Sequence, residues 1–210
     1  MPDPLSGWDA EGTRLALADY RADFRAEDSA IAGQDSWKLE RRQRFRQPGT
    51  ASWEAFARGE WDEALRLIEA RRGPLMKSGA EAAEKGTGLY RVRVVAQPII
   101  GYLQWELHSL RLRAECGERI RVLPAAAVRD LEADGELPEI VTLGPSVAYR
   151  ILYDASGELA GGVKVTDPRA VGRVTGLIRR LYARGEDLGE FFEREVAPLP
   201  PPRGGSVPAR

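Results

Sequence analysis

The chain has 210 residues, of which 43% are hydrophobic and 30% charged, proportions that exclude a disordered chain and a membrane protein. Its formal net charge of -1 gives no overall attraction to nucleic acid, so that class of partner would need a local basic patch. Cys116 is the only cysteine, which excludes an internal disulfide and any multi-cysteine metal site.

Targeting signals are not expected either. Residues 1–8 have neither a basic region nor an apolar core, and no later stretch approaches the 18 or so apolar residues that a membrane helix needs. We therefore expect a cytoplasmic protein that binds no membrane, and we expect no metal and no cofactor.

The first half of the chain predicts mostly helices. In chain order, we expect a helix over 12–25, a strand within 37–46, two short helices within 52–72 interrupted at Gly59, and a further helix over 75–88.

In the middle of the chain, apolar and polar residues alternate more clearly. Tyr90 to Val95 alternates with β-branched residues and predicts a strand, followed by a helix that Pro98 opens and Gly117 ends. A second strand is expected over 118–123, and Pro124 begins a short helix that runs to about Leu131.

The last third predicts a hairpin and two helices. Three strands are expected over 139–143, 147–153 and 162–165, with a turn at 154–157 between the last two. Asp167 caps a helix that Pro168 opens, and a shorter helix follows with Phe191, Phe192 and Val196.

This order of elements predicts the α+β class, with one mixed, mostly antiparallel sheet covered by helices mainly on one face. We expect residues 1–35 to form a peripheral N-terminal helical segment and residues 36–197 to form a single domain. Residues 198–210, rich in proline and glycine, are expected to be a disordered tail.

Glu106 is the one side chain whose predicted position raises a chemical question. On a helical wheel it falls within the apolar face formed by Ile99, Leu103, Leu107, Leu110 and Ala114. A carboxylate buried there costs several kcal/mol, roughly, unless it is paired. We expect its partners among arginines that alternate on the two flanking strands, namely Arg91, Arg93, Arg119 and Arg121.

Two readings of this cluster stay open. It can form an arginine-lined site for an anionic ligand, with Glu106 as orienter or general base. It can equally be a structural ion network that fixes the helix to the sheet.

The outer side of the same helix carries Trp105, His108 and Leu112. They can form an exposed apolar patch that binds a partner protein, or the N-terminal helix can cover them. His108 lacks an orienting carboxylate in the sequence, so we expect surface or partner contact rather than catalysis. We identify no catalytic residues.

Arg41, Arg42, Arg44 and Arg46 form the densest basic run, with Phe45 inside it. Such a run can touch phosphates, but it is more often a solvated edge, and nucleic acid is not expected as a partner. No phosphate-binding glycine motif follows a predicted strand.

Short motifs spread from about Ser36 to Val196 resemble an actinobacterial family, that of the DUF6879 domain of unknown function. The residues that carry the resemblance are Trp37-Lys38-Leu39-Glu40, Phe56 to Glu60, Arg91 to Val95 with Pro98, Tyr102 to Glu106, Gly117 to Arg121, and Tyr153-Asp154 with Gly157. The resemblance implies a small cytoplasmic protein often encoded beside helix-turn-helix regulators and their small partner proteins. It does not cover the N-terminal segment or residues 73–88.

Two functions therefore follow as hypotheses. The first is a non-enzymatic interaction or regulatory accessory protein that acts through the surface around Trp105, with another protein, such as a helix-turn-helix regulator, as partner. The second is a small enzyme or ligand-binding protein with an arginine-lined anion site organised by Glu106.

Overall fold

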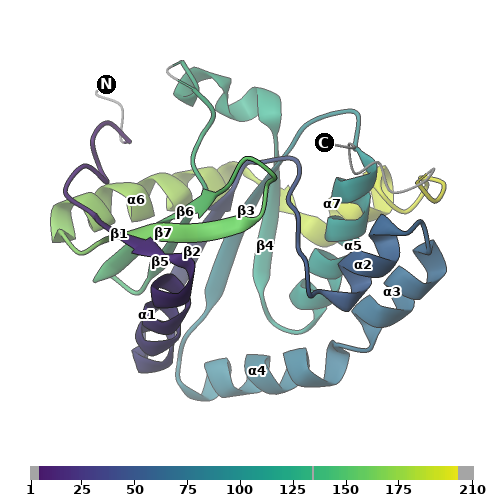
Figure 1. Cartoon of the computed structure of the whole chain (residues 1–210), viewed down its shortest axis with the longest axis horizontal. Helices are drawn as coiled ribbons and strands as arrows, with labels where there is room; N and C mark the ends of the chain where they lie inside the picture. Colours follow the sequence, from purple (N-terminus) through teal and green to yellow (C-terminus); the bar gives the residue numbers. More distant parts are fainter. Residues whose placement is uncertain (1–4, 134, 203–210) are drawn as a thin grey trace.

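A computed structural model describes residues 5–133 and 135–202. Its centre is one eight-stranded mixed sheet with the strand order β1-β7-β6-β5-β2-β3-β4-β8 (Figure 1). Two of its pairings are parallel, β2 with β3 and β3 with β4, and the other five are antiparallel. The predicted α+β class and the mostly antiparallel sheet are confirmed.

The strands follow the alternation of apolar residues in the sequence. The parallel centre consists of β2 (Ser36–Glu40), β3 (Leu89–Val95) and β4 (Arg119–Pro124). The antiparallel part consists of β5 (Ile140–Leu143), β6 (Val147–Tyr153) and β7 (Leu159–Val165), with the short edge strands β1 (Thr13–Ala16) and β8 (Glu186–Asp187).

One face of the sheet is covered by α6 (Pro168–Arg184) and the 3-10 helix η1 (Ala125–Leu131). The Asp167 side chain accepts a hydrogen bond from the Ala170 amide and so caps α6, as the sequence predicts. The stripe of Val171, Val174 and Ile178 packs on alternate residues of β2 and β3, which forms the largest apolar core.

The opposite face carries α1, α5 and α7, at its two ends. At one end α5 (Gly101–Glu115) and α7 (Leu188–Glu195) pack on β4. At the other end α1 (Leu17–Ala30) packs on β5, β6 and β7. The sheet between α1 and α5 is therefore left without an apolar helix directly on it.

Three further helices lie outside this face. The helices α2 (Ala51–Ala57) and α3 (Trp61–Glu69), separated near Gly59 as predicted, pack on the outer side of α5. The helix α4 (Arg72–Glu84) then runs from α3 back towards β3 and has no buried residue (Figure 1). It forms a wall without being part of the core.

Both flanks of the predicted domain contact it. At the N-terminal side, β1 pairs with β7 at the edge of the sheet and Tyr20 of α1 packs edge-on against Tyr149. At the C-terminal side, Gln104 donates a hydrogen bond to the Pro200 carbonyl oxygen at 3.0 Å. The rest of the predicted tail, residues 203–210, lies outside the described residues.

Among the helices of the described ranges, none combines the length and the apolar character needed to cross a bilayer.

Candidate functional site

The alternation of β2 and β3 places charged side chains on the face that α6 does not cover. Trp37 and Leu39 point into the α6 core, so Lys38 and Glu40 point the other way. Their register partners on β3 are arginines: Lys38 lies beside Arg91 and Glu40 beside Arg93.

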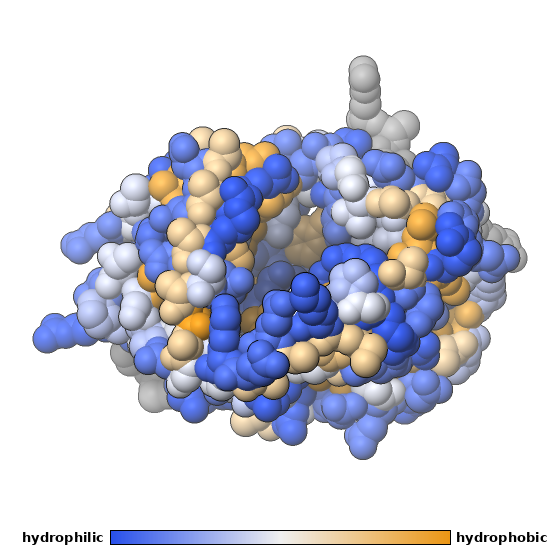
Figure 2. Space-filling model, turned by 90° about the horizontal axis from the view of Figure 1, so that it is seen from below, coloured by the Kyte–Doolittle hydropathy of each residue, from blue (hydrophilic) through white to orange (hydrophobic). Residues whose placement is uncertain are grey.

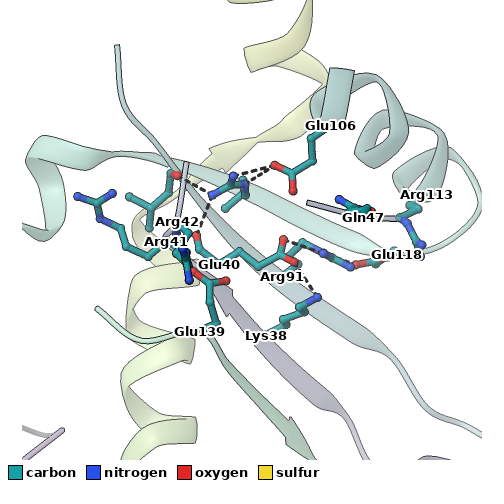
Figure 3. Close-up of polar contacts among 12 residues, drawn as sticks. Lys38, Glu40, Arg41, Arg42, Gln47, Arg91, Glu106, Arg113, Glu118 and Glu139 are labelled. Atoms are coloured by element: carbon teal, nitrogen blue, oxygen red, sulfur yellow. Dashed lines mark hydrogen bonds and ion pairs between the residues drawn. The ribbon is translucent and has the colours of Figure 1, made fainter. Parts of the chain in front are cut away.

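A chain of ion pairs joins these residues (Figure 3). The Lys38 Nζ lies 2.6 Å from Glu40 Oε1, and the Arg91 Nη1 lies 2.7 Å from Glu40 Oε2. Arg91 Nε donates to Glu118 Oε1 at 2.5 Å, and Arg113 Nη1 lies 3.6 Å from Glu118 Oε2. Arg91 is therefore held between two carboxylates.

Glu106 forms a second branch with Arg93. Arg93 Nε donates to Glu106 Oε2 at 2.8 Å, and the Tyr102 hydroxyl donates to Oε1 at 3.0 Å. Gln47 Nε2 in turn donates to the Tyr102 hydroxyl oxygen at 2.7 Å. The predicted pairing of Glu106 with a strand arginine is confirmed for Arg93, whereas Arg91 pairs with Glu40 and Glu118 instead.

Their surroundings shift the pKa values of Glu40 and Glu106 in opposite directions. Burial alone would raise the pKa of Glu40, but the nearby Arg91 guanidinium and Lys38 ammonium hold it well below its ordinary value. For Glu106 burial prevails over the attraction of Arg93, and its pKa is raised. Glu40 is thus a fixed negative charge, while Glu106 binds a proton more readily than an ordinary carboxylate.

Glu139, just before β5, is a buried acid that sequence reasoning missed. Its Oε1 accepts hydrogen bonds from the Arg41 and Arg42 amides at 2.7 and 2.6 Å, while Oε2 has no hydrogen-bond partner among the described residues. Burial and the charge of Glu40 raise its pKa to about 7. Nothing in its local sequence distinguishes it from the exposed glutamates of the chain.

The charged residues surround a cavity of about 400 Å³. Its walls come from α1, the loop after β2 and α5, and its floor from β2 and β3. Three acidic residues line it: Glu40, Glu106 and Glu158. Six basic residues line it: Arg21, Lys38, Arg46, Arg71, Arg91 and Arg113. We call this cavity the charged cleft.

The excess of positive charge is not neutralised inside the cleft. The carboxylates of Glu40 and Glu106 are already ion-paired with the basic residues described above. Glu158 Oε1 lies 3.2 Å from Arg46 Nη1. The guanidinium groups of Arg21 and Arg71 have no acidic partner among the described residues, and burial together with the charges of Arg91 and Arg71 lowers the pKa of Arg113. These features favour an anion as occupant.

Two unused hydrogen-bond donors belong to residues that line the same cavity. The Trp105 Nε1 and the Arg46 Nε are buried and have no acceptor in the part of the chain that the structure describes. A buried donor without an acceptor costs free energy, and a ligand acceptor within the cleft would remove that cost.

The structure does not bring all four predicted arginines together. Arg119 and Arg121 lie on the opposite face of β4, because their neighbours Ile120 and Val122 are the register partners of Arg91 and Arg93. Arg119 Nη1 donates to the Tyr90 hydroxyl oxygen at 2.6 Å, on the α6 side of the sheet. The expectation that both strands present their arginines to one face is wrong. In the register of β4 against β3, the arginines of β4 are displaced by one residue from those of β3, and successive side chains of a strand point to opposite faces.

The predicted partner surface is not exposed. Trp105 and Leu112 are buried, and it is α2 and α3, not the N-terminal helix, that cover them. His108 is half-buried between the rings of Trp61 and Phe192, and burial lowers its pKa to about 4. The imidazole is therefore neutral at pH 7.

The basic run after β2 is largely paired within the protein. Arg41 donates to Glu132 at 2.7 Å, and Arg42 lies over the Tyr153 ring at 4.9 Å. Arg46 alone of the four lines the charged cleft.

This arrangement can bind and orient an anion, and Glu106 can accept a proton there. Within the described ranges, no group of three or more His, Cys, Asp or Glu side chains is placed to hold a metal ion.

Residues 26–193 match the family model described as Domain of unknown function (DUF6879). No curated protein matches the chain.

Proposed function

The chain belongs to the family described as Domain of unknown function (DUF6879), and on the geometry of its charged cleft we propose that it binds a small anionic compound there. The observation that carries this proposal is the lining of the cleft, in which six basic residues face three acidic ones. A cavity of about 400 Å³ falls in the size range of small-molecule sites.

The ion network supports a binding role because it holds the lining groups in place. Arg91, which lines the cleft, and Arg93, which holds the lining residue Glu106, have side chains that are 7% and 0% exposed, and each has a buried carboxylate partner. Such fixed charges do not reorganise when a ligand arrives, which favours affinity. Glu106, with its raised pKa, fits the role of an orienting group or proton acceptor for the bound compound.

A regulatory role is the wider context of this proposal, and it rests on the family resemblance. We place the protein in an actinobacterial cytoplasm with another protein as partner, a helix-turn-helix regulator being the first to test. The surface expected around Trp105 is buried, so a partner would have to contact the rim of the cleft or another face. Co-purification from the native host, with no stable partner recovered, would remove this context and leave ligand binding standing.

The experiment for anion binding is calorimetric titration of the full chain, at low ionic strength, with inorganic phosphate and with butyrate. The test variant is Arg21→Gln combined with Arg71→Gln, since both side chains are exposed at the cleft and carry no ion pair. Arg173→Gln, exposed on α6 at the opposite face, is the matched control.

We expect millimolar binding that the double variant weakens by about twofold to thirtyfold, because each of the two exposed charges contributes roughly 0.2–1 kcal/mol. The control should match the unaltered protein. Equal affinities in all three proteins, or no binding of either anion, would refute the proposal.

A further inference from the structure

A second cavity of about 540 Å³ lies on the same face of the sheet, between α1 and α4. It shares Lys38, Arg91, Tyr153 and Leu159 with the charged cleft, so the two cavities are neighbours with a common wall. Figure 2, which views the molecule from the side of α4, shows the surface hollowed near its centre.

The walls of the second cavity are chemically different. Its sheet side and one side of α1 present the apolar and aromatic side chains Tyr20, Phe24, Ile31, Val141, Leu143 and Ile151, while polar and charged side chains, namely Asp28, Ser78, Glu81 and Lys85, line its α1 and α4 rim. These residues form the edge of the small core between α1 and strands β5 and β6. An apolar group placed there would leave water for an apolar surface, which is favourable.

The boundary between the two cavities is marked by the Lys38 ammonium. An ammonium group has three donors, and the one ion pair of the Lys38 Nζ in the described structure is with Glu40 Oε1. The side chain is 29% exposed, so its remaining donors are accessible from both cavities.

We infer that the ligand is an amphipathic anion, with its anionic head at Lys38 in the charged cleft and an apolar chain or ring in the second cavity. The inference rests on the proposed function and names the class of compound that the cleft accepts. A free phosphate or a short carboxylate would fill the basic cavity and leave the apolar one empty. A longer carboxylate can place its head group in the charged cleft and its hydrocarbon chain against the apolar side chains of the second cavity.

The enclosure of the site favours a small molecule over a protein segment. The sheet forms the floor, and helices α1, α4 and α5 form walls, so the cavities of about 400 and 540 Å³ lie between elements rather than on a flat face. Volumes in this range are typical of small-molecule sites.

The test is calorimetric titration of the full chain with saturated straight-chain carboxylates of about four to twelve carbons, all below their micelle concentrations. A buried methylene contributes roughly 0.8 kcal/mol, so affinity should rise about fourfold for each added carbon until the second cavity is full. Inorganic phosphate is the reference for binding at the charged cleft alone.

Two adjacent positions in α4 supply a matched pair of variants. Ala82 lines the second cavity, whereas Ala83 is exposed and lines neither cavity. Ala82→Phe should remove the dependence on chain length while butyrate and phosphate bind as before. Ala83→Phe should retain that dependence.

The possible outcomes distinguish the proposed function from the inference about the second cavity. If butyrate and phosphate bind but affinity does not rise with chain length, the proposed function stands and this inference is wrong. If affinity rises equally in both variants, the chain does not occupy the second cavity and the inference is again wrong. If no anion binds at all, both proposals fail.

Discussion

Lys38 and Arg91 divide one carboxylate between them: the Lys38 Nζ lies 2.6 Å from one oxygen of Glu40 and the Arg91 Nη1 lies 2.7 Å from the other. The two basic residues are register partners on adjacent parallel strands. Arg91 is also bound by Glu118, so its charge is largely used within the protein. Of these two residues, Lys38 keeps free donors and is the more available to a ligand.

Replacement of Lys38 by Met should therefore weaken anion binding more than it weakens the fold. A charge-assisted hydrogen bond contributes about 1.5–3 kcal/mol, which predicts a loss of tenfold or more in affinity for decanoate. Glu40 keeps Arg91 as its partner, so the free energy of unfolding should fall by only about 1 kcal/mol. Lys77→Met, at a side chain that is 81% exposed on α4, is the control and should bind decanoate normally. Unchanged binding by Lys38→Met would contradict the assignment of the head group.

Glu106→Gln should destabilise the protein strongly. It leaves the fully buried guanidinium of Arg93 without its carboxylate, a change that costs about 3–5 kcal/mol for buried pairs. Urea denaturation measures the difference. The control Glu193→Gln, at a side chain that is 72% exposed, should change the free energy of unfolding by less than about 0.5 kcal/mol. A cost below about 1 kcal/mol for Glu106→Gln would show that Arg93 finds another partner.

Glu139 predicts a specific dependence of stability on pH. In the unfolded chain this carboxyl loses its proton near its ordinary pKa of 4.5, whereas in the folded protein it keeps the proton to about pH 7. The folded state then binds more protons than the unfolded state between these values, so the free energy of unfolding falls as pH rises from about 4.5 to about 7. The total change in the free energy of unfolding that Glu139 contributes across this interval is roughly 3 kcal/mol.

The measurement is the difference between the unaltered protein and Glu139→Gln, because Glu106 shifts in the same direction and contributes to both curves. The stability of Glu139→Gln relative to the unaltered protein should increase across this interval and level off above it. A difference that is constant with pH would mean that Glu139 is ionised in the folded protein.

The two faces of the sheet should differ in their effect on binding. Arg113→Gln removes a positive charge from the charged cleft and should lower the affinity for butyrate by about fivefold, or roughly 1 kcal/mol. Arg119→Gln alters an arginine that pairs with Tyr90 on the α6 side and should leave the affinity unchanged within about twofold. Titration of both variants checks this, and an equal loss in both would indicate a long-range charge effect rather than a site.

Local patterns were sufficient to predict most of the fold. The β-branched alternation of β3, the Asp167-Pro168 start of α6 and the glycine between α2 and α3 each have a direct physical meaning, and each was found where predicted. The burial of Glu106 also followed from its place on the apolar face of α5. These features depend on neighbours close in sequence.

The rest depends on partners far apart in the chain. That β1 joins the sheet beside β7 follows from a pairing between residues about 150 positions apart, which no local pattern encodes. The position of Arg119 depended on the register of β4 against β3, where a shift of one residue reverses the face. The cover of Trp105 likewise depended on how α2 and α3 fold back on α5.

Binding of one amphipathic anion across the charged cleft and the second cavity can be followed residue by residue through backbone amide signals in ¹H–¹⁵N spectra of the full chain titrated with decanoate. We expect the largest shifts to cluster at Lys38, Arg91, Val141 and Ala82, with little change along α6. Shifts confined to α6, or spectra that do not change at all, would contradict this mode of binding.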